Sequence, residues 1–151
     1  MTDTTAGLVC AHHHLYSTLA RGMPSPPQRP HNFISTLEQI WWRLDNALDL
    51  ERIKWSAALG AAEAVLCGTT AIIDHHESPA AIEGSLDAIA QGCDMVGVRV
   101  IPAYGVTDRW TNGNVLTEVH PSDPMTDGAK RGLEECERYL NSGRRGMVGL
   151  H

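Results

Sequence analysis

The sequence predicts an α/β fold in which strands alternate with helices around a parallel sheet. Short apolar runs rich in β-branched residues recur along the chain, amphipathic stretches separate them, and polar residues follow the end of each run. This alternation implies right-handed crossovers and a parallel sheet that is covered by helices. A length of 151 residues suits one domain with a core better than two. We therefore treat residues 1–151 as one domain.

The first third of the chain predicts a strand, a loop and a helix. Residues 8–11 form a short apolar run that is typical of a buried strand. Residues 23–30 are rich in proline, which excludes a helix or a central strand. Ser35 and Glu38 have the spacing of a capping box, and apolar residues over 34–48 fall at helical intervals. We expect one helix in this segment.

The middle of the chain predicts a second helix followed by a second strand. The helix is expected to run from Asp49 to Cys67, where Gly68 supplies the usual stop. Residues 69–73 are β-branched and apolar on both faces, which favours a strand that is buried on both sides. This strand is expected to end at Asp74.

The next segment predicts a helix, a strand and a long loop. Ser78 and Pro79 suit the N-cap and first position of a helix that continues toward Met95. Residues 96–102 form the third expected strand. Residues 104–126 contain several glycines and prolines and predict a loop, and a loop of this length in a compact domain is usually functional or disordered.

The last segment predicts one more helix and one more strand. Asp127 is expected to cap a helix that ends near Gly143. Residues 147–150 then begin a fourth strand, whose last residue is His151. The predicted order is therefore β-αα-β-α-β-α-β.

Composition limits the classes of partner. The net charge is −6, and no cluster of Lys or Arg is present, which argues against nucleic acid and against an anionic membrane surface. No apolar run is long enough to span a bilayer, and the N-terminus lacks the features of a secretory signal, so we expect a cytoplasmic location. A small molecule is the expected ligand. The four cysteines form no C-x-x-C pair and are interpreted as buried thiols: Cys10, Cys67, Cys93 and Cys136.

Histidines gather at the predicted carboxyl ends of the strands, where parallel α/β sheets bind their ligands. Six of the eight histidines lie there: His12, His13, His14, His75, His76 and His151. An expression tag is a poor explanation for the first three, because they follow an apolar run directly. This clustering predicts a functional face.

The spacing of His12 and His14 suits a metal pair. Alternate residues of a strand share a face, so these two side chains point one way and His13 points the other way, toward packing or a supporting role. Catalytic zinc usually takes three protein ligands, and the candidates for the third are Asp74, His75 and His151. Because such sites tolerate little error in geometry, we expect this chain alone to bind zinc weakly at most.

Four stretches resemble the amidohydrolase superfamily. Residues 7–16 are similar to its first-strand signature, P-G-x-x-x-x-H-x-H, with Ala6 in place of the proline. Residues 33–37, 41–45 and 70–79 resemble the SsnA-type aminohydrolases, in the branch with chlorohydrolases and purine deaminases. The likeness extends from Gly7 to the end of the chain.

The resemblance implies a metal-dependent hydrolase with a (β/α)₈ barrel. Such enzymes use a metal-bound hydroxide to attack a ring or amidine carbon, which would make this protein an aminohydrolase, or deaminase, acting on C–N or C–Cl bonds of a small heterocycle. The implied metal ligands are His12 and His14, the implied metal is Zn²⁺ or alternatively Fe²⁺, and His151 is implied to face the substrate.

The resemblance also implies that only part of the barrel is present, about the first four β/α units. Relatives take further ligands and a proton-shuttling acid from later strands, and a barrel typically needs about 250 residues. We therefore interpret residues 1–151 as the N-terminal half of a catalytic domain. The alternative is a non-catalytic half-barrel that dimerises, or that pairs with another chain.

The roles of several further residues have two interpretations. His75 and His76 either contact substrate or cap the end of a strand, and Glu77 is either an acid or base in a cleft or a charge near a helix N-terminus. Trp41 lies on the apolar stripe and is expected in the core, whereas Trp42 lies off it and is a candidate for lining the site. Residues 108–110 form a charged, aromatic loop tip that either covers the substrate or lies in solvent. His31 and His120 are expected to be solvated.

Overall fold

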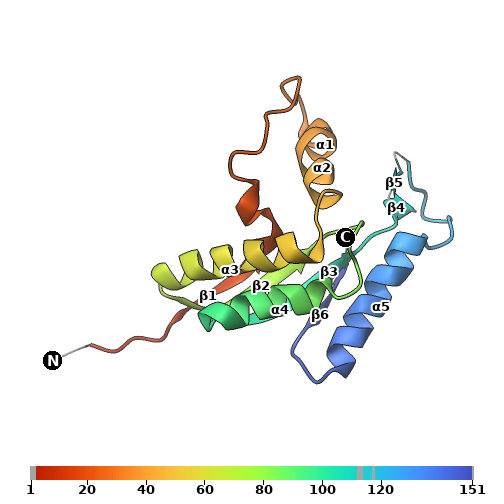
Figure 1. The fold of residues 1–151 in the computed structure, drawn as a ribbon. Helices are drawn as coiled ribbons and strands as arrows, with labels where there is room; N and C mark the ends of the chain where they lie inside the picture. Colours follow the sequence, from red (N-terminus) through yellow and green to blue (C-terminus); the bar gives the residue numbers. More distant parts are fainter. Residues whose placement is uncertain (1–2, 112–113, 117, 151) are drawn as a thin grey trace.

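The computed structural model describes residues 3–111, 114–116 and 118–150, and it has the predicted α/β architecture (Figure 1). Four strands form one parallel sheet in the order β1-β2-β3-β6. Their bounds are Leu8–His13, Thr69–His76, Arg99–Val106 and Met147–Leu150. Because each strand lies beside the next one in sequence, the sheet is an open arc of the kind that begins a (β/α)₈ barrel.

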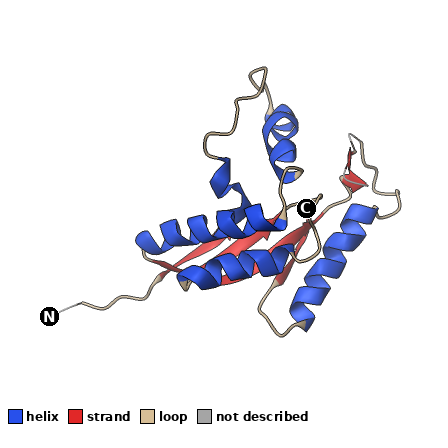
Figure 2. Ribbon diagram, in the orientation of Figure 1, coloured by secondary structure: helices blue, strands red, loops and turns tan. Residues whose placement is uncertain are grey.

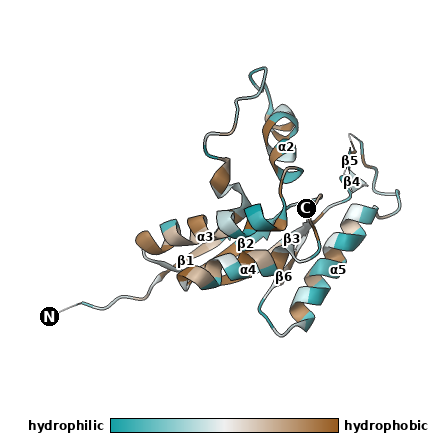
Figure 3. Cartoon of the chain, viewed as in Figure 1, coloured by the Kyte–Doolittle hydropathy of each residue, from teal (hydrophilic) through white to brown (hydrophobic). Residues whose placement is uncertain are grey.

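Helices α3 (Leu50–Leu66), α4 (Ser85–Val96) and α5 (Asp127–Asn141) pack against the sheet, and Figure 2 shows α3 and α4 side by side across it. The core lies between these helices and the strands. Figure 3 shows mainly hydrophobic colours along α4 and much more hydrophilic colour along α5. The buried residues of α5 are accordingly confined to one side of the helix.

The second helix is confirmed as predicted. Asp49 is the N-cap of α3, and its Oδ1 accepts a hydrogen bond of 2.7 Å from the Arg52 backbone N–H. Gly68 follows the helix with a φ of +82°, which favours glycine because other residues pay a steric cost there.

The first predicted helix is present but irregular. It consists of α1 (Phe33–Thr36), the π-helical turn η2 (Leu37–Trp41) and α2 (Trp42–Asp45). The predicted capping box at Ser35 and Glu38 was wrong: Asn32 is the N-cap and accepts from the Ser35 backbone N–H at 2.8 Å. The Ser35 hydroxyl in turn accepts from the Asn32 N–H at 3.1 Å, so Ser35 closes the box from inside the helix.

Strand β2 is longer than predicted and alternates in burial. Asp74, His75 and His76 belong to the strand and do not follow it. The expectation of burial on both faces was wrong, because Ile72, Asp74 and His76 are fully buried whereas His75 is only half-buried. Helices cover one face of the sheet, which buries every second residue.

Helix α4 begins at Ser85, with Gly84 as N-cap, and the predicted start at Ser78 was wrong. The Ser78 hydroxyl donates to the Ala81 carbonyl at 2.8 Å in a turn, so it caps no helix. Gly97 ends α4 with a φ of +87°, and β3 therefore starts at Arg99, three residues later than predicted.

The predicted loop over 104–126 contains more structure than expected. Strand β3 extends to Val106, and β4 (Trp110–Thr111) pairs with β5 (Asn114–Val115) in an antiparallel hairpin. Helix α5 is capped by Thr126 and not by Asp127, since the Thr126 hydroxyl accepts from the Ala129 N–H at 3.2 Å.

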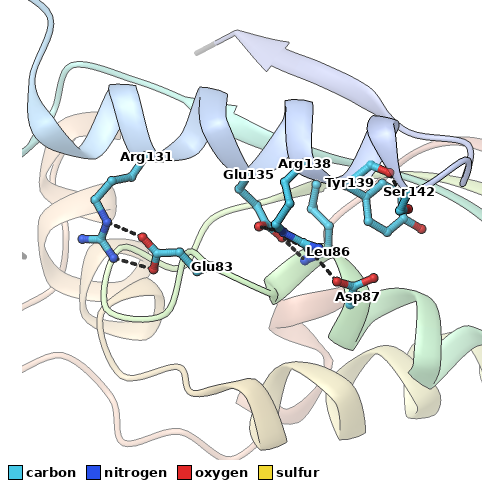
Figure 4. Close-up of polar contacts among 8 residues, drawn as sticks. All are labelled: Glu83, Leu86, Asp87, Arg131, Glu135, Arg138, Tyr139 and Ser142. Carbon is cyan, nitrogen blue, oxygen red and sulfur yellow. Dashed lines mark hydrogen bonds and ion pairs between the residues drawn. The ribbon is translucent and has the colours of Figure 1, made fainter.

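Ion pairs join α5 to α4 and to the loop before it (Figure 4). Arg131 contacts Glu83 at 2.6 Å, and Arg138 contacts both Asp87 at 2.6 Å and Glu135 at 2.7 Å. Both members of the Arg131–Glu83 pair and of the Arg138–Asp87 pair are partly exposed. Each of these two pairs therefore stabilises the fold by only about 0 to 1 kcal/mol.

The cysteines differ from one another in burial. Cys93 and Cys136 are buried, as expected, whereas Cys10 is half-buried and Cys67 is exposed, which contradicts the expectation for both. All four are free thiols. Among the residues that the structure describes, no helix is long and apolar enough to span a membrane.

Candidate functional site

The side chains of His12 and His14 converge at the carboxyl end of β1. Their Nε2 atoms are 3.1 Å apart. His14 Nδ1 lies 2.9 Å from the backbone oxygen of His75 in the neighbouring strand. A backbone acceptor at Nδ1 places the proton there, so the Nε2 lone pair of His14 points toward His12.

The separation of these nitrogens fits two ligands of one metal ion. Imidazole nitrogens about 2.0 to 2.1 Å from zinc are about 3.1 to 3.4 Å apart when the angle at the metal is roughly 100 to 110°. Within the described ranges, no group of three or more His, Cys, Asp or Glu side chains gathers at such a point, so Asp74 and His75 do not complete the set. His151 lies outside the described residues.

Asp74 fixes the backbone next to His14. Its carboxyl is fully buried, and its Oδ1 accepts a hydrogen bond of 2.6 Å from the Leu15 N–H. Burial raises the pKa of Asp74 to about 7, although this hydrogen bond opposes the shift. Strand β2 thus holds the His14–Leu15 segment at two points, through the Asp74 side chain and through the His75 backbone oxygen.

His75 and His76 lie on opposite faces of β2. The His75 ring meets the His14 ring edge to face, with centroids 5.4 Å apart. His76 is fully buried between Tyr16 and Tyr104, and its Nε2 lies 2.9 Å from the Ser78 hydroxyl. Burial lowers the pKa of His76 to about 3, so its ring is neutral. The geometry therefore does not support His76 as a substrate contact.

A pocket of about 480 Å³ adjoins the histidine pair. Aromatic rings form much of its wall, and polar side chains from four segments project into it. The aromatic residues are Tyr16, Phe33, Trp41, Trp42 and Trp110, and the ionisable ones are His14, Asp45, His75, Glu77 and Arg109. Pockets with apolar walls and a few convergent polar groups are typical of small-molecule sites.

Trp41 and Trp42 both border this pocket. Trp41 packs against the core, as predicted, but also reaches the pocket wall. Trp42 lines it, as its position off the apolar stripe suggested, and the Arg109 guanidinium lies 5.2 Å from its ring centroid. A cation over a tryptophan ring is a favourable contact that holds both side chains in place.

The loop tip over 108–110 contributes to the wall. Arg109 also donates to the Leu116 carbonyl at 3.1 Å, and Trp110 is 5% exposed, with its Nε1 donating to Glu77 Oε2 at 3.2 Å. Asp108 instead accepts from the Thr126 N–H at 2.9 Å. Glu77 is 6% exposed and lies in the pocket, and it does not lie at the start of α4.

Sequence reasoning missed Asp45 and Tyr16. Asp45 is 3% exposed and lies near the Tyr16 hydroxyl. Burial and the nearby Glu77 raise the pKa of Asp45 to about 8, while Tyr16 opposes the shift. Burial, followed by Asp45, raises the pKa of Tyr16 as well. The available signal was an acidic residue one helical turn after Trp41, on the face that its ring marks as buried.

The remaining described histidines, His31, His120 and His13, lie outside the pocket. His31 and His120 are exposed. His13 is half-buried, and burial lowers its pKa. It does not border the pocket.

Comparison with known proteins explains this arrangement. The profile of the amidohydrolase family matches residues 4–149. The chain belongs to the amidohydrolase family. Its relatives include the 5'-deoxyadenosine deaminase of Methanopyrus kandleri, 32% identical over 144 residues, and the 5-methylthioadenosine/S-adenosylhomocysteine deaminase 2 of Archaeoglobus fulgidus, 28% identical over 143 residues. These matches cover 95% and 94% of this chain but only 27% and 29% of the relatives.

Solved structures with the same fold are also found. A mutant of the atrazine chlorohydrolase TrzN from Arthrobacter aurescens TC1, complexed with zinc and atraton, matches with a TM-score of 0.66 and 22% identity. An amidohydrolase from a Sargasso Sea sample matches with a TM-score of 0.61 and 16% identity. They align with 95% and 94% of this amidohydrolase chain, which covers 33% and 31% of theirs. The fold is therefore a partial (β/α)₈ barrel.

Proposed function

We propose that this amidohydrolase chain supplies the metal-binding part of an aminohydrolase that releases ammonia from a small cyclic amidine. The observation that carries the proposal is the convergence of His12 Nε2 and His14 Nε2, 3.1 Å apart, beside an aromatic pocket. The matched deaminases and chlorohydrolase support a leaving group on a heterocyclic carbon, either an amino group or chloride.

In this proposal His12 and His14 hold the metal, and Zn²⁺ is the preferred ion with Fe²⁺ as the alternative. The zinc in the chlorohydrolase structure supports this choice. The metal would supply a nucleophile at neutral pH, because it lowers the pKa of bound water toward about 7. The His75 backbone oxygen orients the His14 ring, and Asp74 fixes the adjoining backbone.

The pocket residues are assigned to the substrate. Trp42 and the other aromatic rings suit a flat heterocycle, and the His75 side chain borders the same space. We keep His151, from the sequence resemblance, as a proposed substrate contact. His76 instead supports Tyr16 from the buried side of β2.

A second candidate is a half-barrel that works only when it pairs with another chain or with a second copy of itself. The observation that favours it is the edge strand β1, where Leu8 is 60% exposed and Val9 is 64% exposed. An apolar edge strand of this kind favours pairing with a further chain.

An ammonia-release assay tests the proposed activity. The chain, both alone and joined to the remaining β/α units of a matched deaminase, is incubated with zinc in excess and with 5'-deoxyadenosine, cytosine, guanine or an aminotriazine, and its native mass is measured in the same buffer. We expect ammonia from at least one substrate, loss of that activity in the double variant His12→Ala, His14→Ala, and retention in the control His31→Ala, His120→Ala. Activity confined to an oligomer would favour the second candidate.

Two results would contradict the proposal. One is the absence of ammonia above the buffer level for every substrate, even when the chain is joined to the remaining β/α units. The other is ammonia release that is equally fast in the wild type and in the His12→Ala, His14→Ala variant.

A further inference from the structure

Two carboxyl groups lie in the pocket next to the histidine pair. Asp45 is 3% exposed and Glu77 is 6% exposed, and both border the same cavity. Asp45 Oδ1 is shielded from solvent and has no hydrogen-bond partner among the residues that the structure describes. A buried acceptor without a partner costs free energy, so its retention needs an explanation.

The position of Asp45 is unfavourable for a carboxylate in two further ways. It is the last residue of α2, where the negative end of the helix dipole repels an anion. Glu77 is close enough to disfavour its ionised form. An apolar or amide side chain would avoid these costs, so the carboxyl group is unfavourable for stability here, as is typical of residues in binding sites.

Neighbouring side chains surround these two carboxyl groups at the pocket wall. Trp110 Nε1 donates to Glu77 Oε2, and this contact orients the Glu77 carboxylate at the pocket wall. The Tyr16 hydroxyl lies near Asp45 and favours its ionised form. The cation of Arg109 lies over the Trp42 ring and donates to Leu116.

The walls of the pocket suit a flat, positively charged ring. Trp41, Trp42 and Trp110 present aromatic surfaces beside the two carboxyl groups. Aromatic faces attract cations, and carboxylates form strong charge-assisted hydrogen bonds with N–H groups of a cation. A bound cation would supply the positive charge that favours the ionised form of Asp45. An amidinium edge carries two such N–H donors on one side of a planar group.

We propose that Asp45 and Glu77 recognise the N–H edge of a planar cyclic amidine and favour its protonated form. This inference rests on the proposed function and specifies its substrate class. Protonation also makes the amidine carbon more electrophilic, so the same preference would favour attack at that carbon. Asp45 and Glu77 are thus specificity residues of the pocket.

A binding experiment without metal or turnover tests this inference. Benzamidine, a planar amidinium at neutral pH, and benzamide, its uncharged isostere, are titrated into the metal-free protein, and tryptophan fluorescence reports occupancy. We expect benzamidine to bind about tenfold or more tightly than benzamide, since a charge-assisted hydrogen bond is worth at least that factor.

The variants localise the preference. Asp45→Asn and Glu77→Gln are each expected to bring the two affinities within about twofold of one another. Glu38→Gln, which removes an exposed carboxylate from the same helical segment, is the matched control and keeps the preference. Thermal unfolding of each variant checks that the fold is intact.

Equal affinity of the wild type for benzamidine and benzamide would overturn the inference, even if the protein releases ammonia. An unchanged preference in both Asp45→Asn and Glu77→Gln would overturn it as well. Conversely, a clear preference in a protein that releases no ammonia would support this subsite and count only against the proposed activity. If Asp45→Asn melts early and loses both ligands alike, Asp45 has a structural role and the inference fails.

Discussion

Two buried carboxyl groups, Glu135 on α5 and Asp45 on α2, have nearly the same exposure but opposite surroundings. Glu135 is 2% exposed and accepts hydrogen bonds from Arg138 at 2.7 and 2.9 Å and from the Leu86 N–H at 3.2 Å. Asp45 is 3% exposed, and its defined neighbours are a neutral phenol and a second carboxyl group. Figure 4 shows the Glu135 carboxylate together with its partners Arg138 and Leu86.

This difference distinguishes a carboxylate that stabilises the fold from a carboxyl group that does not. Glu135 joins α5 to the start of α4, so its charge is compensated within the fold. Asp45 receives no such compensation from residues 3–111, 114–116 and 118–150, and it borders a pocket. Buried ionisable groups that lack compensation are concentrated at functional sites, which is why we place Asp45 in the binding site.

The largest effect is expected when each of the two carboxyl groups is replaced by its amide. Glu135→Gln is expected to lower the free energy of unfolding by about 2 kcal/mol, because hydrogen bonds to a charged partner are worth about 1.5 to 3 kcal/mol and Arg138 is partly exposed. Asp45→Asn is expected to leave it within about 0.5 kcal/mol or to raise it. Urea unfolding at pH 8 measures both. Equal destabilisation by the two changes would abolish the distinction.

A smaller effect is expected in the pH dependence of stability. The folded-state pKa of Asp45 is about 8, above the unfolded value of 3.8, so the folded protein holds a proton that the unfolded chain releases. The stability that this bound proton gives to the folded state is lost as the pH rises toward and through 8.

Relative to Asp45→Asn, the wild type should therefore lose up to about 2 kcal/mol of stability between pH 6 and 8. Asp74 and His76 titrate in both proteins, so their contributions cancel in the difference. Urea unfolding curves recorded across this range give the result. A wild type that instead gains stability relative to the variant would show that Asp45 is ionised and compensated.

Much of the fold could be predicted from the sequence because local signals were strong. The spacing of apolar residues and the predicted stops at Gly68 and Gly143 correspond to real helix ends, whereas Gly97, which ends α4, was assigned to a strand. Errors arose where two residues compete for one role. Ser35 and Ser78 both suit an N-cap, but neighbouring backbone groups engage them otherwise, which a linear pattern does not reveal.

The site was predictable only in part. The alternation within a strand placed His12 and His14 together, and the resemblance to a family gave them a role. The same alternation should have separated His75 from His76, but β2 was expected to end before them. Asp45 and Tyr16 come together only when the Tyr16 ring meets the helical segment at Trp41, with centroids 6.3 Å apart, and no sequence spacing encodes that contact.

The most direct test is a measurement of zinc binding by isothermal titration calorimetry. The wild type is expected to bind one zinc ion per chain weakly but saturably, because two converging imidazoles form only part of a catalytic site. The double variant His12→Ala, His14→Ala should lose this binding, and the control His31→Ala, His120→Ala should retain it. Equal zinc binding by the wild type and by His12→Ala, His14→Ala would contradict the account.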